Sequence, residues 1–308
     1  MELRHLRYFV AVAEEGHITR AAERLGIQQP PLSKQIGALE RELDVRLLRR
    51  TARGVELTDA GRALLEHARA MLALSHQAVE TTRRTARGEQ GQISLGVAPT
   101  GPFHPFVPRV IRAFRDAWPL VSLTLEESFT NDLVERIRGE KIDVAFLRTP
   151  VHDPAGLAIN HLLDEPMVVA LPAAHALAGT DDGQAPIPLK ALSGETFVVF
   201  GRRFGPGLYD ATVKACRAAG FDPRLGQEAP RITSTLGFVA AGLGIALVPA
   251  SMRRVSMDGV VYRGFAGPLQ PTAVLNLASR RADPSAVVRR FVDLVKRSAK
   301  AFADNPSA

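Results

Sequence analysis

The 308-residue chain contains one cysteine, one tryptophan and three tyrosines, and it lacks long runs of uncharged apolar residues. The single cysteine, Cys216, cannot form an intrachain disulfide, which favours a reducing compartment. No apolar run approaches the roughly 20 residues that span a bilayer, and the first residues lack the pattern of a signal peptide. We therefore expect a cytoplasmic protein with no membrane partner.

The sequence also lacks the residue arrangements that carry catalysis or metal binding. Its eight histidines do not cluster at metal-ligand spacings, no phosphate-binding GxxxxGK segment occurs, and no nucleophile, base and orienting group stand out. The segment 242–244, Gly-Leu-Gly, reads as a helix-to-strand turn and not as a nucleotide-binding fingerprint. Cys216 falls in a predicted helix, where a buried structural role is expected. We expect neither an enzyme nor a protein that holds a cofactor or metal.

Positive charge, in contrast, is abundant. The chain has 39 Lys and Arg residues against 32 Asp and Glu residues, and its net charge is +7. Residues 1–88 hold 15 of these cations and 11 of these acids, so the first quarter of the chain carries more than half of the excess. This balance favours an anionic partner, and the length allows two or three domains.

Three short helical patterns fill the N-terminal segment. The first spans residues 3–15 and ends at Gly16, the second spans about 18–25, and residues 26–28 form a tight turn before the third. The third opens with Pro30 and Pro31, which suit a first helical turn because a proline needs no N–H partner there. This order predicts a helix-turn-helix. The residues expected to face inward are Leu6, Phe9, Val10, Ala13, Ile18, Ala21, Ala22, Leu25, Leu32, Ile36, Leu39 and Leu43.

The outer face of the third helix carries small and hydrogen-bonding side chains, which can enter a DNA major groove. Four arginines follow without an intervening acid, and residues 49–57 end in a hairpin-like Gly-Val-Glu-Leu, so guanidinium groups on this wing would hold phosphates. The alternative is a plain helical bundle with a solvated arginine face. The candidates for DNA contact are Gln29, Ser33, Lys34 and Gln35 on the helix, and Arg46, Arg49, Arg50 and Arg53 on the wing.

A long helical pattern follows Thr58 and Asp59, either of which can cap a helix. It could run for roughly 30 residues, about 45 Å, because no proline interrupts the chain before Pro99. A helix of that length with one apolar seam usually pairs with a partner, although it could instead pack on its own domain. Residues 88–91, Gly-Glu-Gln-Gly, predict a hinge. The seam consists of Leu65, Ala68, Leu72, Ser75, Val79 and Thr82.

Beyond the hinge, strand and helix patterns alternate, which favours an α/β fold with largely parallel sheets. Two lobes of similar size would bind a ligand between them, outside the carboxyl ends of the strands. The predicted domains are 1–58 for DNA binding, 59–88 for the linker helix and 89–308 for a regulatory body. Within that body, lobe I covers about 92–163 and 269–303, and lobe II covers about 164–268.

Candidate ligand groups lie where strands become helices. Thr100 precedes a helix expected over 102–117, and Thr130 heads the next helix, where free backbone N–H groups attract anions. In the other lobe, the segment Phe200-Gly201-Arg202-Arg203 ends a strand, and arginine can grip a carboxylate with two hydrogen bonds. The alternatives are that both threonines only cap their helices and that both arginines are solvated.

The segment HITRAAERLGIQQPPLSKQIGALERELDVRLLRRTARGVELTDAG closely resembles the N-terminal signature of LysR-type transcriptional regulators. Three further segments, LGVAPTG, GEKIDVAFLR and STLGFVAAGLGIALVPAS, resemble the effector domain of that family, so the resemblance covers nearly the whole chain. The opening MELRHLRYFVAVAEEG and the QQPPLSKQI helix look most like the branch that controls degradation of benzoate, catechol, chlorocatechol and other aromatic compounds.

The resemblance implies a winged helix-turn-helix, a long linker helix and a two-lobed α/β effector domain like periplasmic solute-binding proteins. It implies that the protein binds promoter DNA as a homodimer through the linker helix, usually assembled into a homotetramer, with RNA polymerase as a further candidate partner. The implied effector is a small, anionic molecule such as an aromatic carboxylate or muconate.

By match to the family's motifs, the resemblance implies that five residues contact DNA: Gln29, Pro30, Ser33, Lys34 and Arg53. Thr100 and Thr130 match the primary effector site, facing the segment 200–203. Arg148 matches a position that lines a second effector pocket in some relatives. Two residues depart from the pattern: His17 replaces a common serine before the second helix, and Gln28 replaces a small residue before the third.

Two other classes of protein are alternatives to a transcriptional regulator. The body alone resembles a solute-binding or transport-linked protein, but the first 57 residues and the missing export signal argue against that function. An enzyme on an α/β fold is the third hypothesis, and no catalytic constellation supports it. A ligand-responsive DNA-binding regulator accounts for both halves of the chain.

Overall fold

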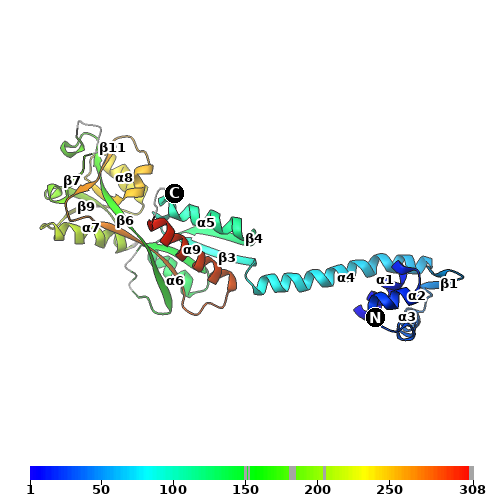
Figure 1. The fold of residues 1–308 in the computed structure, drawn as a ribbon. Coiled ribbons are helices and arrows are strands. Elements are labelled where there is room, and N and C mark those ends of the chain that lie inside the picture. The colour runs from blue at the N-terminus through cyan, green and yellow to red at the C-terminus, as the bar shows by residue number, and fades with distance from the viewer. Residues whose placement is uncertain (149–150, 152, 180–184, 204–205, 305–308) are drawn as a thin grey trace. The chain divides into compact units, whose positions relative to one another are not determined.

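The computed structural model describes residues 1–148, 151, 153–179, 185–203 and 206–304. The chain divides into two compact units, Met1–Arg84 and Thr85–Ala308 (Figure 1). Each unit has hydrophobic cores of its own, as expected when separate apolar patterns are buried by separate domains.

Unit 1 is a helix-turn-helix followed by a two-stranded wing. The second and third helices begin where the sequence predicts, and Gly16 and Gly26 end the first two helices in the left-handed conformation that glycine adopts without strain. His17 precedes the second helix without a side-chain cap, as its replacement of serine suggests. The elements are α1 (Leu3–Glu15), α2 (Ile18–Leu25), α3 (Gln29–Leu43), β1 (Leu48–Thr51) and β2 (Gly54–Leu57).

The core of unit 1 differs slightly from the predicted one. Phe9, Leu32 and Leu39 are fully buried, but Ala11 and Val12 are buried where Val10 and Ala13 were expected. The reason is that α1 contacts α2, α3 and β2 together, so its buried face is broader than a single stripe. Residues at the edge of that face are half-buried instead.

The long helix α4 (Asp59–Ala86) begins at a threonine cap, because the backbone N–H of Gly61 donates to the hydroxyl of Thr58 over 3.0 Å. Its first half packs on the core of unit 1 through Leu64, Leu65, Ala68 and Leu72. Beyond that point the seam is bare: Leu74 is 65% and Val79 46% exposed. The expectation that this helix packs on its own domain therefore holds for its first half, and pairing with a partner stays a prediction.

Unit 2 is built around one mixed sheet with the strand order β10-β6-β13-β5-β3-β4, to which β11 is added beside β6. Strand β3 runs parallel to β4 and β5, whereas β13 runs antiparallel to β5 and β6. The expectation of largely parallel sheets is corrected accordingly. The strands are β3 (Gln90–Val97), β4 (Leu120–Glu127), β5 (Val144–Arg148), β6 (Leu157–Pro172), β10 (Ala246–Pro249), β11 (Val260–Arg263) and β13 (Thr272–Arg280).

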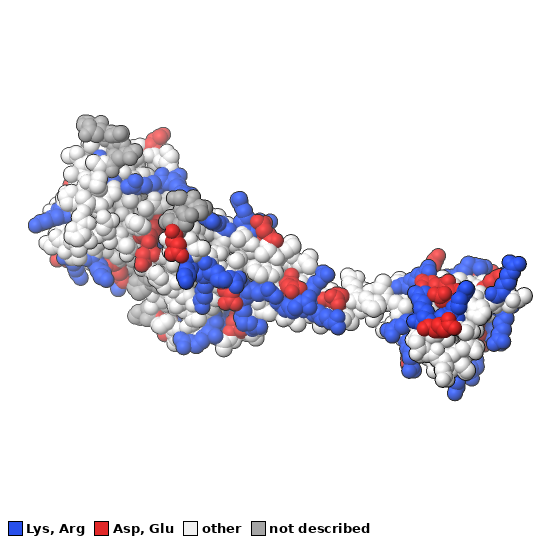
Figure 2. Space-filling model, viewed as in Figure 1, with Lys and Arg blue, Asp and Glu red and all other residues white. Residues whose placement is uncertain are grey.

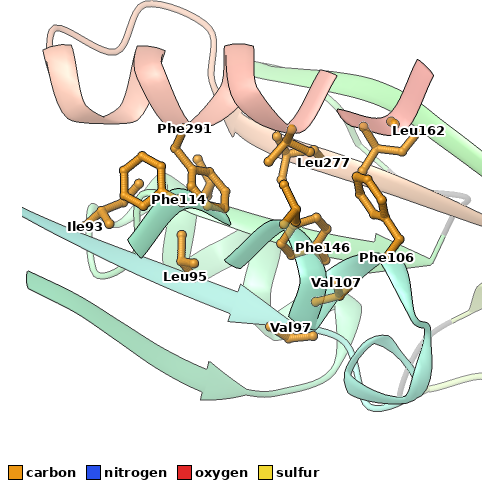
Figure 3. Close-up of a cluster of buried hydrophobic side chains, with 14 of the residues drawn as sticks. Ile93, Leu95, Val97, Phe106, Val107, Phe114, Phe146, Leu162, Leu277 and Phe291 are labelled. Carbon is orange, nitrogen blue, oxygen red and sulfur yellow. The ribbon is translucent and has the colours of Figure 1, made fainter. Parts of the chain in front are cut away.

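Lobe I has helices on both faces of its part of this sheet. Helices α5 (Phe106–Ala117) and α9 (Ala286–Asp304) lie together on one face, where Phe114 and Phe291 meet edge to face at 5.0 Å between ring centres (Figure 1). Figure 3 shows their side chains and those of the strands filling this layer. Helix α6 (Thr130–Arg138) packs on the opposite face.

Lobe II repeats this layering on the second half of β6. Alternate residues of β6 face opposite sides, as the pleat of a strand requires: Val169 contacts the cluster that includes α7, and Val168 the cluster that includes α8. The elements of this lobe are β7 (Ile187–Pro188), β8 (Thr196–Phe200), α7 (Pro206–Ala218), β9 (Arg224–Ala229), α8 (Ile232–Ala240), the 3-10 helix η4 (Ala250–Arg254) and β12 (Phe265–Ala266).

The structure corrects two further expectations. The helix expected over 102–117 is broken: a 3-10 helix η1 (Gly101–Phe103) comes first, and α5 starts at Phe106. His104 is extended between them because the residue before a proline is disfavoured in helical conformation. The expected hinge is also not free, since Gly88 is buried and a Cβ there would lie 2.6 Å from the backbone of Ala286.

The two helical glycines of unit 1 provide a matched stability test. A Cβ on Gly61 would lie 2.1 Å from the carbonyl oxygen of Leu47, whereas a Cβ on Gly37 would meet nothing within 4 Å. We expect Gly61→Ala to destabilise unit 1 by about 1–3 kcal/mol through overpacking, and Gly37→Ala to stabilise it by up to about 1 kcal/mol through helix propensity. Hydrogen exchange of peptides from residues 1–58 measures both, and equal protection of the two variants would contradict the close approach.

Candidate DNA-binding surface and effector cleft

The outer face of α3 is polar and open, as the sequence predicts. Gln29, Pro30 and Lys34 are exposed, and Ser33 and Gln35 are half-buried. The amide of Gln29 donates to the hydroxyl of Ser33 over 3.2 Å, which orients both side chains on the first turns of the helix. Side chains of this size and chemistry at the start of a helix are suited to the edges of bases and to nearby phosphates.

The wing places arginines beside this helix. Strands β1 and β2 pair antiparallel with Arg50 opposite Val55, and Arg50 and Arg53 are exposed. Arg49 is held by Glu56 across the hairpin, with Nη2 to Oε2 at 2.6 Å. In the described ranges, the side chains of Lys34, Arg50 and Arg53 make no hydrogen bond or ion pair within the protein, so their charge is available to an anionic partner.

A groove of about 540 Å³ separates α3 from the wing and is lined by residues of both, including Ser33, Gly37 and Arg50. On the face of unit 1 shown in Figure 2, Lys and Arg side chains are interspersed with acidic ones. On this face the positive charge is therefore not one continuous patch. It is useful for binding only where unpaired cations gather, which is the case at the end of the wing.

In unit 2, Thr100, Thr130 and Arg148 from lobe I and Phe200 and Leu208 from lobe II line one small cavity. Its volume is about 20 Å³, which is room for about one water molecule. The cavity lies at the carboxyl ends of β3 and β5, where a ligand is expected in an α/β fold. The structure thus places Arg148, which the family match had assigned to a second pocket, in the lining of the same cavity as Thr100 and Thr130.

Arg148 is the centre of this cluster and is only 4% exposed. Its Nε donates to the hydroxyl of Thr100 over 3.0 Å, its Nη1 to the carbonyl of Ala273 over 3.0 Å, and its Nη2 to a carboxylate oxygen of Glu165 over 2.5 Å. Burial lowers the pKa of Arg148, and the neighbouring carboxylate opposes that shift. An arginine guanidinium keeps its positive charge in proteins.

Glu165 is the residue that the sequence reasoning missed. It lies in the middle of β6, is 5% exposed, and its second oxygen accepts the backbone N–H of Ser251 at the start of η4 over 2.7 Å. His104 lies 4.0 Å away, and burial lowers its pKa, partly opposed by Glu165 and reinforced by Arg148 and Arg254. The carboxylate of Glu165, on β6, therefore bonds to a residue of lobe I and to a residue of lobe II. No sequence signal marks it, because its partners are 17 and 86 residues away.

Neither threonine caps its helix through its side chain. Thr100 accepts from Arg148, and the hydroxyl of Thr130 donates to the carbonyl of Arg148 over 3.4 Å. Both hydroxyls are buried at the cavity, which excludes the reading in which they serve only as caps.

The arginines of the segment 200–203 are a different case, and the expectation for them is corrected. Phe200 lines the cavity and lies 6.0 Å from the ring of Phe129. Gly201 is buried, while Arg202 and Arg203 are exposed. Arg202 is ion-paired with Asp210 over 2.9 Å and lines a surface pocket outside the cavity. The turn after β8 directs these side chains to solvent, so only Phe200 of the four lines the cavity.

The remaining titratable groups show no second reactive centre in the part of the chain that the structure describes. Cys216 is buried in α7, and burial raises the pKa of its thiol to about 11, so it is protonated at neutral pH. Among the described residues, no group of His, Cys, Asp and Glu is arranged to hold a metal ion. Likewise, none of the described helices combines the length and apolarity that a membrane span requires.

Two family models match the chain. Residues 3–62 match the bacterial regulatory helix-turn-helix protein of the lysR family, and residues 86–300 match the LysR substrate binding domain. The chain belongs to the LysR family of bacterial transcriptional regulators. It binds DNA and carries an effector-binding domain, and the family is not one of enzymes.

Relatives of this LysR-family protein match it over nearly its whole length. The regulator BudR of Raoultella terrigena is 39% identical, over 96% of this chain and all of that protein. AlsR of Bacillus subtilis is 37% identical, over 96% and 95% of the two chains. The crystal structure of full-length CbnR with its target DNA has a TM-score of 0.82 and 31% identity, over 97% and 100%. The family prediction is confirmed, and the aromatic branch stays a prediction.

The buried pair of Arg148 and Glu165 generates a stability test. Removing one partner leaves an uncompensated buried charge, so we expect Glu165→Gln to cost about 3–5 kcal/mol. The matched control is Glu126→Gln, which breaks a pair with Arg136 of the same 2.5 Å length on a more exposed surface, and it should cost within about 1 kcal/mol. Trp118 is the single tryptophan and lies in unit 2, so its fluorescence during urea unfolding reports the relevant unit. Similar midpoints for both variants would contradict this account.

Proposed function

We propose that this LysR-family regulator controls promoters in response to a small anionic effector, an aromatic or muconate-like carboxylate, bound between the two lobes. The observation that carries the proposal is the buried guanidinium of Arg148 at the interlobe cavity. Three of its five N–H donors bond to Thr100, Ala273 and Glu165. In the described part of the chain, two N–H groups therefore remain for a carboxylate, beside the apolar wall of Phe200 and Leu208.

Effector binding must change the arrangement of the lobes, since the cavity now has room for about one water. A ligand shifts such an equilibrium only through its different affinity for the two states. An anion on the two remaining N–H groups of Arg148 shares the positive charge of this guanidinium with Glu165, which also holds η4 of lobe II. Binding of the ligand would thus weaken the attraction between Arg148 and Glu165.

We propose that promoter DNA is contacted by α3 and the wing, through Gln29, Pro30, Ser33, Lys34, Gln35, Arg50 and Arg53. The support is their exposure or partial exposure on one open surface and the absence of internal partners, in the described ranges, for Lys34, Arg50 and Arg53. Phosphate contacts from such cations would give salt-dependent affinity, and the polar residues of α3 would read base edges.

The second half of α4 supports the proposal of a homodimer. Leu74 and Val79 in this half are 65% and 46% exposed, and Met71, just before it, is 38% exposed. A second copy of the same helix would cover them, and two copies could read two half-sites. A homotetramer, contact with RNA polymerase and a cytoplasmic location complete the proposal, on the strength of the family.

Lys34→Ala tests the DNA surface. Loss of one phosphate contact should weaken binding to all sequences and reduce the slope of log affinity against log salt by about 0.9. Arg83→Ala on α4 removes the same charge from a residue that is ion-paired with Glu80 and should leave the slope unchanged. The measurement is a salt titration of binding to a duplex selected from random sequences by the wild-type protein. An unchanged slope for Lys34→Ala would remove this residue from the DNA surface.

Thr100→Val tests the effector cavity. A panel of aromatic acids and muconates is first screened for a compound that shifts the footprint of the wild-type protein on DNA. The variant should keep its DNA affinity but bind that compound about tenfold or more weakly, because the hydroxyl that orients Arg148 is lost. The control is Thr124→Val, which removes a hydroxyl bonded to Ser94 on exposed β4. A normal response of Thr100→Val would show that the effector binds elsewhere.

A further inference from the structure

A buried acid lies at the base of the groove between α3 and the wing. The side chain of Glu40, in the last turns of α3, is 9% exposed and lines this groove beside Arg46, Arg49 and Arg50. A carboxylate in this place repels phosphates, so it is not itself suited to contact DNA. Its bonds indicate a different role.

Glu40 holds the start of the wing. Its Oε1 accepts the backbone N–H of Leu47 over 2.8 Å and that of Leu48 over 3.1 Å, while its Oε2 pairs with Arg46 over 3.1 Å. Leu48 is the first residue of β1 and pairs with Leu57 at the base of the hairpin. Two hydrogen bonds from one carboxylate therefore fix the position and direction in which the wing leaves α3.

The backbone carbonyl groups of Arg46 and Leu47, just before the wing, are held by Thr58 at the start of α4. The hydroxyl of Thr58 donates to the carbonyl of Arg46 over 2.7 Å, and its backbone N–H donates to the carbonyl of Leu47 over 3.0 Å. Gly61 allows this approach because a Cβ would overlap the oxygen of Leu47. Since α4 supports the carbonyls, Glu40 is the contact that ties this junction to α3 itself.

We propose that Glu40 is a positioning residue for DNA binding, which holds the wing at the distance from α3 that lets both elements contact one duplex. It acts through Arg50 and Arg53, because the position of these wing residues relative to α3 depends on the anchored start of β1 at Leu48. The inference rests on the proposed DNA contacts of these two arginines, and the experiment below tests the two claims separately.

The experiment is a double-mutant cycle on the full chain, with the slope of log affinity against log salt as the readout, on the selected duplex. Arg50→Ala/Arg53→Ala alone should reduce the slope by about 2, as two phosphate contacts are lost. Glu40→Ala alone should reduce it by about 1–2, although it removes a negative charge. In the Glu40→Ala background, the two arginine substitutions should reduce the slope by less than half of their effect in the wild type.

A purely structural role for Glu40 gives a different result. Partial unfolding of unit 1 would lower the active fraction at every salt concentration and leave the slope unchanged. The matched control is Glu42→Ala, which removes an exposed carboxylate two residues away whose partner is the N-terminal amine, and it should leave the slope as in the wild type. Glu40→Gln should restore most of the slope, since an amide oxygen can accept both backbone N–H groups.

The outcomes separate the two claims. If the arginine pair does not change the slope, the proposed wing contacts are wrong. If the arginine pair does, but Glu40→Ala has the wild-type slope or adds fully to the arginines, the positioning role is overturned. Failure of Glu40→Gln to restore the slope would also overturn the backbone anchor. Should Glu40→Ala not fold, Glu40→Asp retracts the carboxylate from the same N–H groups and is judged by the same criteria.

Discussion

The antiparallel pairing of β6 with β13 is the constraint on which the architecture of unit 2 depends. Both strands run through the sheet between lobes, with β13 pairing from Thr272 to Arg280 along β6 and a register shift after Leu275. Strand β6 continues past this pairing into lobe II, where β10 and β11 pair with its second half, so β6 is the strand that the two lobes share. The cavity at Arg148 lies beside this crossing, and Glu165, in the middle of β6, ties the strand to both sides of it. Glu165 is therefore the residue at which the shared strand is bonded to lobe I and to lobe II.

The candidate sites of both units contain the same arrangement of groups. In each, a buried carboxylate accepts backbone N–H groups at the start of another element and pairs with one arginine: Glu40 with β1 and Arg46, and Glu165 with η4 and Arg148. The Arg148–Glu165 pair is buried, whereas Arg46 is 83% exposed, so in unit 1 only the carboxylate and its backbone N–H partners are enclosed. Such a contact fixes the position of one element relative to another: the wing relative to α3 in unit 1, and η4 relative to β6 in unit 2.

Sequence reasoning was strongest where structure is local. The bounds of α2, the glycine ends at Gly16 and Gly26 and the wing hairpin follow from periodicity and turn chemistry within a few residues. Prediction failed where contacts between distant segments determine the structure. Strand β9 is polar and almost fully exposed, so its sequence shows no apolar alternation. The partners of Glu165 are far from it in the sequence. The threonines could be placed at the cavity by motif, whereas the position of Arg148 in the same cavity and the outward turn at Arg202 required the structure. The broken helix at His104–Pro105 was readable in principle, because proline restricts the residue before it.

The segment that joins the units shows how a change in lobe I could reach α4. Gly88 packs against the first residue of α9, Ala286, and Arg290 of α9 donates to the carbonyl of Arg87 over 2.5 Å. At the other end of α9, the ring of Phe302 lies 5.9 Å from that of His104, which faces Glu165. One helix therefore contacts both the neighbourhood of the buried carboxylate and the base of the linker. A packed helix moves as a rigid body rather than deforming along its length. Within unit 2, a displacement of α9 at the cavity end would thus shift the backbone at Arg87.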